Sequence, residues 1–132
     1  MKILDSDHCV AILRSQLDLT EHMGAGEELA ITAVAVGELI HGAAKSRHAV
    51  ENLARVDTLL AAVTVLPFDE WSARRFGLLK AQLKQAGQAI GDIDLLIASI
   101  ALDREGTLVT HNTRHFSRLV GAAGLILEDW LE

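Results

Sequence analysis

The chain has 132 residues, half of them hydrophobic, which is enough for one domain with a sizeable core and too little for two. Its 18 acidic residues against 12 lysines and arginines give a formal net charge of −6, which argues against a broad basic surface for non-specific nucleic-acid binding. A single cysteine excludes an internal disulfide framework and favours a reducing compartment. The mean hydropathy of +0.27 favours an oligomer or a bound partner, because a monomer would leave apolar groups in water.

The N-terminal residues predict a cytoplasmic protein. Asp5 and Asp7 stand where a signal peptide would need an apolar run. No stretch approaches the roughly 18 apolar residues that a membrane-spanning helix needs. We therefore expect no association with a membrane.

The first half of the chain predicts strands that alternate with helices. Short apolar runs predict strands at 1–4 and 29–31, and the spacing of apolar residues predicts helices over 8–17, 33–45 and 49–62. Asp7 and Thr32 are the expected N-caps of the first two helices, since their side chains can accept hydrogen bonds from free backbone amides.

The second half continues this alternation. A β-branched run predicts a strand at 63–67, followed by an amphipathic helix over 69–86 that Gly87 would end. A helix over 92–104, a strand at 107–110, a short helix near 113–118 and a strand at 125–127 follow in order. This pattern predicts an α/β fold with a mostly parallel central sheet and helices on both faces. Such sheets gather ligands and catalytic groups beyond the carboxyl ends of their strands.

Acidic side chains recur at the positions where this rule places chemistry. Asp5 follows the first strand, Glu38 interrupts an apolar helix, and Asp92 and Asp94 open the helix that leads into the strand at 107–110. Carboxylates that converge on one end of a sheet repel each other. Raised pKa values could relieve that repulsion, but a hard divalent cation such as Mg²⁺ or Mn²⁺ is the commoner solution. A bound cation of this kind can lower the pKa of a water and polarise a phosphoryl oxygen, which is chemistry for phosphodiester cleavage.

Each acid also has a structural interpretation. Asp92 is better explained as a helix N-cap than as a ligand, because an acid there satisfies free amides and the helix dipole. The evidence for Asp94, which would lie just inside the first turn, is balanced between the two roles. Glu38 could lie on a solvated face, and Asp5 could simply begin a turn.

Other motifs give little support for a different chemistry. The chain has no P-loop, no dinucleotide fingerprint and no nucleophile elbow. His111 and His115, four residues apart, could share a zinc ion, but no third ligand is marked. Cys9 beside His8 is expected to be a core residue, since neighbours in sequence point to different faces.

Four blocks, each modest alone, are specific when they occur together. They are ILDSDHCVAIL, ITAVAVGELIHGAAKS, VLPFDEWSARRFGLLKAQLKQAGQAIGDIDLLIASIAL and TLVTHNTRHFSRLVGAAGLILEDW, and they cover nearly the full length. In this order they resemble the PIN-domain ribonucleases, specifically the VapC-type toxins of bacterial type II toxin–antitoxin pairs. The resemblance implies a single PIN domain over 1–132, built as a three-layer sandwich around a mostly parallel sheet. It also implies a Mg²⁺-dependent endoribonuclease that hydrolyses phosphodiester bonds in a structured RNA.

The family's acidic site maps onto Asp5, Glu38 and Asp94. The resemblance implies that Asp5 and Asp94 hold Mg²⁺, for which Mn²⁺ can substitute, and that Glu38 orients a water or completes the metal shell. Asp92 is then a helix cap or a supporting group. Asn112 stands where PIN domains often carry a further Asp, which argues against a second metal.

Smaller features of the resemblance concern the residues around these acids. Ser6 and Thr110 fit family positions that carry a hydroxyl near the site, and Asp7 stands where many members have Asn. Arg114 and Arg118 are candidates for contacts with RNA phosphates, and ordinary surface arginines are the alternative.

The resemblance also implies a toxin homodimer and a cognate VapB-type antitoxin that covers the site. The helices predicted over 8–17 and 49–62 carry apolar side chains that could line a groove for a partner helix, although the core is the stronger interpretation: Ile12, Leu13, Leu53, Leu59 and Leu60. This acidic chain carries no DNA-reading motif, so contact with DNA is expected only through the antitoxin.

Two rival functions stay open. A non-catalytic module would keep the fold and bind RNA or a protein without cutting, and Asn112 gives it slight support. A receiver-like signalling domain would also place an Asp at a strand end over Mg²⁺, but the strand at 63–67 ends without a suitable acid and LILEDWLE contains no Lys. The presence of all three family acids favours the nuclease.

Overall fold

A five-stranded sheet forms the centre of the computed structural model, which describes residues 1–131. Its strands are β1 (Lys2–Leu4), β2 (Leu29–Thr32), β3 (Thr64–Leu66), β4 (Thr107–Val109) and β5 (Ile126–Glu128). They lie in the order β3-β2-β1-β4-β5, and every neighbouring pair is parallel. The carboxyl ends of the strands therefore meet at one edge of the sheet, where side chains from distant parts of the chain come together.

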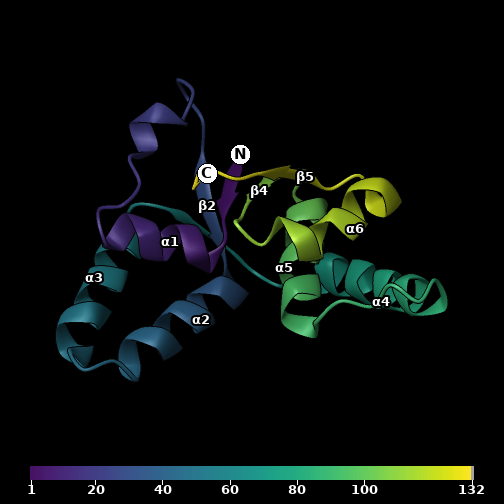
Figure 1. The fold of residues 1–132 in the computed structure, drawn as a ribbon, viewed down its shortest axis with the longest axis horizontal. Helices are drawn as coiled ribbons and strands as arrows, with labels where there is room; N and C mark the ends of the chain where they lie inside the picture. The colour runs from purple at the N-terminus through teal and green to yellow at the C-terminus, as the bar shows by residue number, and fades with distance from the viewer. Residues whose placement is uncertain (132) are drawn as a thin grey trace.

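Helices cover both faces of this sheet (Figure 1). They are α1 (Ser6–Leu13), α2 (Ala33–Ala44), α3 (Ala49–Ala61), α4 (Glu70–Gln85), α5 (Asp92–Asp103) and α6 (Thr113–Ala123), with a short 3₁₀ turn at Leu19–Glu21. In Figure 1, α1, α2 and α3 lie on one side of the strands and α4, α5 and α6 lie on the other. This arrangement confirms the predicted α/β sandwich.

Alternation along the central strands builds a separate core on each face. Ile3 and Leu108 belong to a core that contains residues of α4, α5 and α6. Leu4 and Val109 belong to the second core, which contains residues of α1, α2 and α3. Because successive strand residues point to opposite faces, each short strand is buried on both sides and reads as a continuous apolar run.

Helix α1 begins earlier than the sequence predicted. Asp5, not Asp7, is its N-cap, and Asp5 Oδ1 accepts a hydrogen bond from the backbone N–H of Ser6 at 2.8 Å. The predicted start at residue 8 was wrong because either acid of the DSD sequence can cap a helix chemically. The helix also ends at Leu13 rather than at residue 17, and Ser15 just beyond it has a left-handed φ of 56°.

Of two further predicted N-caps, the one for α2 is confirmed and the one for α5 is corrected. Thr32 caps α2 as expected, since its Oγ1 accepts from the backbone N–H of Ala35 at 3.1 Å. Gly91, not Asp92, is the N-cap of α5, so the interpretation of Asp92 as a cap was wrong. As the first helical residue, Asp92 still suits the positive end of the helix dipole.

The last helix is longer than the pattern indicated. Helix α6 runs to Ala123 instead of ending near residue 118, and Gly124 ends it with a left-handed φ of 75°. Among residues 1–131, no helix combines the length and the apolar character that crossing a membrane requires.

Candidate active site

The carboxyl edge of the sheet carries a buried carboxylate and a buried hydroxyl from adjacent strands. Asp5 follows β1 and Thr110 follows β4, and Thr110 Oγ1 donates to Asp5 Oδ2 at 2.8 Å. Asp5 is only 6% exposed and Thr110 is fully buried. Since the other oxygen of Asp5 caps α1, both carboxylate oxygens are held in one orientation.

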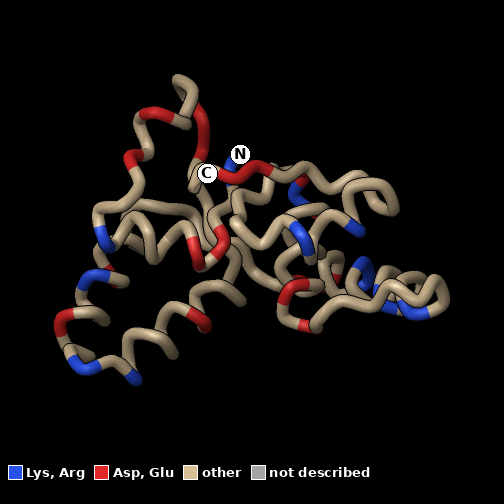
Figure 2. Tube along the Cα trace, in the orientation of Figure 1, with Lys and Arg blue, Asp and Glu red and all other residues tan. Residues whose placement is uncertain are grey.

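Glu38 and Asp94 approach Asp5 from helices that cover opposite faces. Glu38 is an exposed residue of α2, and Asp94 lies in the first turn of α5. In the Cα trace of Figure 2, acidic positions lie at the β1–α1 junction, on α2 and at the start of α5, between the two groups of helices. We call Asp5, Glu38 and Asp94 the acidic edge.

Burial and neighbouring negative charge raise the pKa of two carboxylates of the acidic edge, Asp5 and Glu38. Burial raises the pKa of Asp5, against the opposing hydrogen bond from Thr110. The negative charges of Asp7 and Asp94 raise that pKa further. Partial burial raises the pKa of Glu38, and the charge of Asp5 adds to the rise. These shifts indicate that the acids are close enough for the charge of one to affect the ionisation of another.

Asp94 has two polar neighbours from the start of α6. Its Oδ2 lies 3.2 Å from Nδ1 of His115 and 3.4 Å from Nδ2 of Asn112. The Asn112 Nδ2 also lies 3.0 Å from His115 Nδ1, so this ring nitrogen either accepts from the amide or donates to the carboxylate. His115, which the sequence suggested only as a zinc ligand, therefore lies at the acidic edge.

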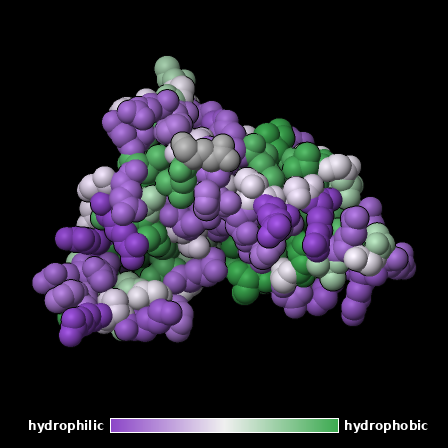
Figure 3. Space-filling model, viewed as in Figure 1, coloured by the Kyte–Doolittle hydropathy of each residue, from purple (hydrophilic) through white to green (hydrophobic). Residues whose placement is uncertain are grey.

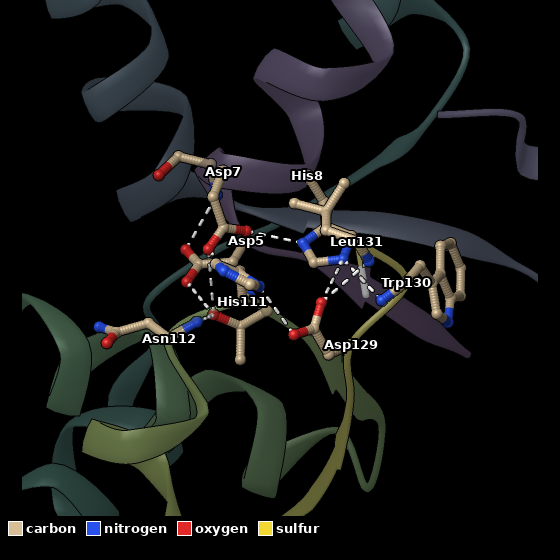
Figure 4. A network of polar contacts seen from close by, with 10 residues as sticks. Asp5, Asp7, His8, His111, Asn112, Asp129, Trp130 and Leu131 are labelled. Atoms are coloured by element: carbon tan, nitrogen blue, oxygen red, sulfur yellow. Dashed lines mark hydrogen bonds and ion pairs between the residues drawn. The ribbon is translucent and has the colours of Figure 1, made fainter. Parts of the chain in front are cut away.

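Asp7, which the sequence analysis named only as a helix cap and as a departure from the family pattern, also lies at the site. Its Oδ2 accepts a hydrogen bond from the backbone N–H of His111 at 3.0 Å, and its Oδ1 lies 2.7 Å from Nδ1 of His8 (Figure 4). Burial on its own would raise the pKa of Asp7, but these hydrogen bonds outweigh burial and the pKa is lowered. The signals in the sequence were a second acid two residues after Asp5 and the departure from the family's usual Asn at this position.

The predicted arginines lie on α6 in different settings. Arg118 Nη1 donates to the backbone carbonyls of Gln88 and Ala89, at 3.4 and 2.6 Å. Arg118 therefore ties α6 to the segment that precedes α5. Arg114 is exposed in the first turn of α6, on the helix that also carries His115.

Asp92 is an exposed residue at the start of α5 that pairs with a lysine of α4. Its Oδ1 lies 3.0 Å from Nζ of Lys80 on α4, and both side chains are largely exposed. An exposed pair of this kind contributes little to stability. Asp92 consequently offers a control for Asp94, two residues along the same helix.

A cavity of about 480 Å³ opens beside the acidic edge, between α1, α2 and α3. Ser6 and Glu38 line it at the end nearest the edge, and a hydrogen bond from Ser6 opposes the rise in the pKa of Glu38. Figure 3 shows hydrophobic side chains in this hollow with hydrophilic ones around it. Of the five apolar residues predicted for a groove, Leu13 lines the cavity, and the others pack against the core: Ile12, Leu53, Leu59 and Leu60.

The residues of the acidic edge fit a hydrated divalent cation better than a closed metal cage. Within residues 1–131, no three His, Cys, Asp or Glu side chains are grouped closely enough to hold a metal ion by themselves. Mg²⁺ usually keeps several waters and binds only one or two carboxylates. Because burial and neighbouring acids raise the pKa of Asp5, a cation near Asp5 and Asp94 would favour their ionised forms.

In the part of the chain that the structure describes, His111 and His115 do not form a shared zinc site. His111 Nδ1 lies 2.8 Å from Asp129 Oδ2, whereas His115 Nδ1 faces Asp94, so the two rings have different partners. Cys9 is fully buried as predicted, and burial together with the charges of Asp5 and Asp7 raises the pKa of its thiol to about 12. A thiol with this pKa is not a nucleophile at neutral pH.

Known proteins resemble this chain over almost its whole length. The family model of the PIN domain matches residues 2–122. The ribonuclease VapC2 of Rickettsia felis is 33% identical over 97% of this chain and 96% of its own length. The tRNA(fMet)-specific endonuclease VapC of Shigella flexneri is 32% identical, with the same coverage of 97% and 96%.

Solved structures give the same result. The crystal structure of VapBC2 from Rickettsia felis, bound to a DNA fragment from their promoter, contains a chain with a TM-score of 0.87 and 32% identity, covering 98% of both chains. The crystal structure of DNA-bound VapBC from Salmonella typhimurium gives a TM-score of 0.88 at 30% identity, covering 98% of this chain and 97% of that one. The protein therefore belongs to the PIN-domain family, among its VapC-type members.

Proposed function

We propose that the protein is a metal-dependent endoribonuclease toxin that hydrolyses phosphodiester bonds of a structured RNA. The observation that carries this proposal is the meeting of Asp5, Glu38 and Asp94 at the carboxyl edge of a PIN-domain sheet. The two relatives compared above are named as a ribonuclease and as a tRNA endonuclease, which supports RNA as the substrate class.

Each residue of the acidic edge has a role that follows from its position. When bound, Mg²⁺ or Mn²⁺ would lower the pKa of a water and stabilise charge on a phosphoryl oxygen, with Asp5 and Asp94 as its carboxylate ligands. Thr110 and the first amide of α1 keep the Asp5 carboxylate in one orientation. Glu38, exposed at the mouth of the cavity, accepts a hydrogen bond from the attacking water and orients it. Asn112 donates to Asp94 without adding charge, which supports one cation rather than two.

We also propose that a VapB-type antitoxin occupies the cavity between α1, α2 and α3. The solved relatives are VapBC complexes. The cavity has an apolar floor, and three basic side chains also line it: Arg14, Lys45 and Arg55. Such a surface suits an amphipathic segment that carries acidic side chains. A segment seated there would cover Glu38 and exclude RNA. Contact with promoter DNA is assigned to the antitoxin, since this chain carries a net charge of −6.

The proposed homodimer has its support in exposed apolar side chains outside that cavity. Trp71 and Leu78 on α4 are 66% and 75% exposed, and Phe68 just before this helix is 40% exposed. Apolar groups exposed together commonly mark an interface. Light scattering of the purified chain measures the oligomeric state. The proposed place of action is the cytoplasm, where the RNA substrate occurs.

Cleavage of purified RNA tests the proposed function. The purified chain is incubated with total RNA in Mg²⁺, in Mn²⁺ and in EDTA, beside Asp94→Asn and the control Asp92→Asn. We expect discrete fragments that require metal, persist with Asp92→Asn and vanish with Asp94→Asn. The sequence at the fragment ends then identifies the RNA. Failure of the antitoxin-free wild type to cut any RNA would instead support the non-catalytic module.

A further inference from the structure

His8 is a fully buried polar side chain that the proposed cleavage does not use. It lies on α1, three residues after Asp5, and its two ring nitrogens have different partners. Nε2 lies 3.0 Å from the backbone N of Trp130, and Nδ1 lies 2.7 Å from Oδ1 of Asp7. Figure 4 shows the ring between these two partners, with the C-terminal segment on one side and Asp7 on the other.

These partners decide where the ring proton lies. The backbone N–H of Trp130 can only donate, so Nε2 must offer its lone pair. The proton of a neutral imidazole is then on Nδ1, which donates to Asp7. Asp129 Oδ1 is farther from Nε2, at 3.6 Å, and already accepts from the backbone N–H of Leu131 at 2.9 Å. His8 therefore accepts a hydrogen bond from the Trp130 N–H in the C-terminal segment and donates one to Asp7.

Asp7 continues this link to the turn after β4. Its Oδ2 accepts from the backbone N–H of His111 and lies 3.4 Å from Oγ1 of Thr110. The same Thr110 hydroxyl donates to Asp5 Oδ2 and accepts from the backbone N–H of Asn112 at 3.0 Å. This turn therefore positions the Thr110 hydroxyl against Asp5 and the Asn112 side-chain amide beside Asp94.

We propose that Asp7 and His8 are positioning residues of the nuclease site: the N–H of Trp130 fixes the tautomer of His8, His8 orients Asp7, and Asp7 holds the turn at Thr110–Asn112 against Asp5. We call Asp7, His8 and the Trp130 N–H the clamp. This inference rests on the proposed nuclease function. It adds that the C-terminal segment, which contributes none of Asp5, Glu38 and Asp94, sets the geometry of the acidic edge.

Packing alone could hold the C-terminal segment in place. The indole of Trp130 stacks on the ring of His22, with centroids 5.0 Å apart and planes 7° from parallel, and it is part of the core under α1. Packing, however, does not depend on which atom of residue 8 donates a hydrogen bond. The clamp does, and isosteric substitutions separate the two explanations.

Two substitutions each keep one half of the His8 link. His8→Asn keeps an amide donor near the position of Nδ1, so Asp7 keeps its partner and the Trp130 N–H loses its acceptor. His8→Gln can keep an acceptor near the position of Nε2, so Trp130 keeps its partner and Asp7 loses its donor. We expect His8→Gln to lower the single-turnover cleavage rate about 10- to 100-fold, the usual cost of removing a group that orients a ligand, with the RNA Kd unchanged. His8→Asn should stay within about threefold of wild type, because the support of Asp7 is retained.

The comparison is made well below the melting temperature of both variants, with Asp92→Asn as a surface control. Equal cleavage rates for His8→Asn and His8→Gln, whether both normal or both slow, would overturn the positioning role. A purely structural role does not depend on which of the two hydrogen bonds of His8 is kept. A parallel change in RNA Kd would overturn it as well.

The tautomer is tested without any activity measurement. In the ¹⁵N NMR spectrum of wild-type imidazoles, we expect His8 to carry a single proton on Nδ1, and the His111 amide resonance to move more in His8→Gln than in His8→Asn. A proton on Nε2, or on both nitrogens, would contradict the clamp even if neither variant folds. A wild-type chain that cuts no RNA would overturn the proposed nuclease instead, so the two failures are distinguishable.

Discussion

The acidic edge and the one carboxylate of the clamp, Asp7, lie close together at the carboxyl edge of the sheet, and their surroundings shift carboxylate pKa values in opposite directions. At the acidic edge, burial and neighbouring charge raise the pKa of Asp5 and Glu38. In the clamp, hydrogen bonds from His8 and from the His111 amide outweigh burial and lower the pKa of Asp7.

Asp5 and Asp7 are only two residues apart, but they lie in different surroundings. Burial dominates at Asp5, which receives two hydrogen bonds and faces two other acids, whereas Asp7 receives hydrogen bonds from the adjacent His8 and from the distant His111 amide that outweigh its burial. An acid with enough donors can hold a turn in place. Under the proposed function Asp5 is a cation ligand, whereas Asp7 holds a turn in place, so the loss of each should have a different effect.

The largest expected effect is on cleavage by Asp94→Asn. Removing this charge takes away one of two proposed cation ligands, so the rate should fall on the order of a hundredfold or more. Asp92→Asn, on the same helix but paired with Lys80 at the surface, should cleave like wild type. Rates are measured under single-turnover conditions at saturating metal. A similar loss in both variants would mean that the helix terminus, rather than the acidic edge, is required.

Asp5→Asn should lower the cleavage rate about as much as Asp94→Asn does. In the absence of metal, the same substitution should stabilise the fold. The folded-state pKa of Asp5 is raised above its ordinary value of 3.8, so ionising it costs stability as the pH rises from 3.8 through the raised pKa. The amide has no such cost, and its oxygen can still cap α1. We expect a higher melting temperature than wild type at pH 7 in EDTA, and no difference below pH 3.8. A lower melting temperature at pH 7 would contradict the raised pKa of Asp5, which burial and the neighbouring acids cause.

Asp7→Asn should have the opposite effect on stability. An amide at this position gives the Nδ1 proton of His8 and the His111 amide a weaker acceptor, and a loss of about 1–2 kcal/mol in the free energy of unfolding is expected. Because the folded-state pKa of Asp7 is lowered, the difference from wild type should be complete above pH 3.8 and shrink as the pH falls through the lowered pKa. Urea unfolding at pH 7 and at acid pH measures it. A stabilised variant at pH 7 would remove the contrast with Asp5.

The smallest effect is expected from Arg114→Ala. This exposed arginine on α6 lies on the helix that carries His115, and loss of one phosphate contact should weaken RNA binding and reduce the slope of log Kd against log salt by about one. Arg118→Ala should instead destabilise the fold, because Arg118 is engaged with the carbonyls of Gln88 and Ala89. Binding measured over a salt series separates the two, and an unchanged slope for Arg114→Ala would exclude that contact.

The fold could be predicted from short-range patterns, whereas the clamp could not. Apolar runs fixed the positions of β1 and β4, and the rule for parallel sheets then placed Asp5 beside the turn that carries Thr110. The choice between Asp5 and Asp7 as the cap of α1 was undetermined, because both acids have suitable chemistry and only the strand pairing decides. The partner of His8 is 122 residues away, at Trp130, and nothing in the local sequence marks a backbone donor at that distance.

Cation binding by the RNA-free chain tests the acidic edge most directly. The melting temperature of the wild type and of Asp5→Asn, Asp94→Asn and Asp92→Asn is measured at pH 7 over a titration of Mn²⁺ and of Mg²⁺. A cation that binds only the folded chain raises its melting temperature with concentration. We predict a rise for the wild type and for Asp92→Asn, and none for the other two variants. An equal rise in all four, or none in the wild type, would contradict a cation site on Asp5 and Asp94.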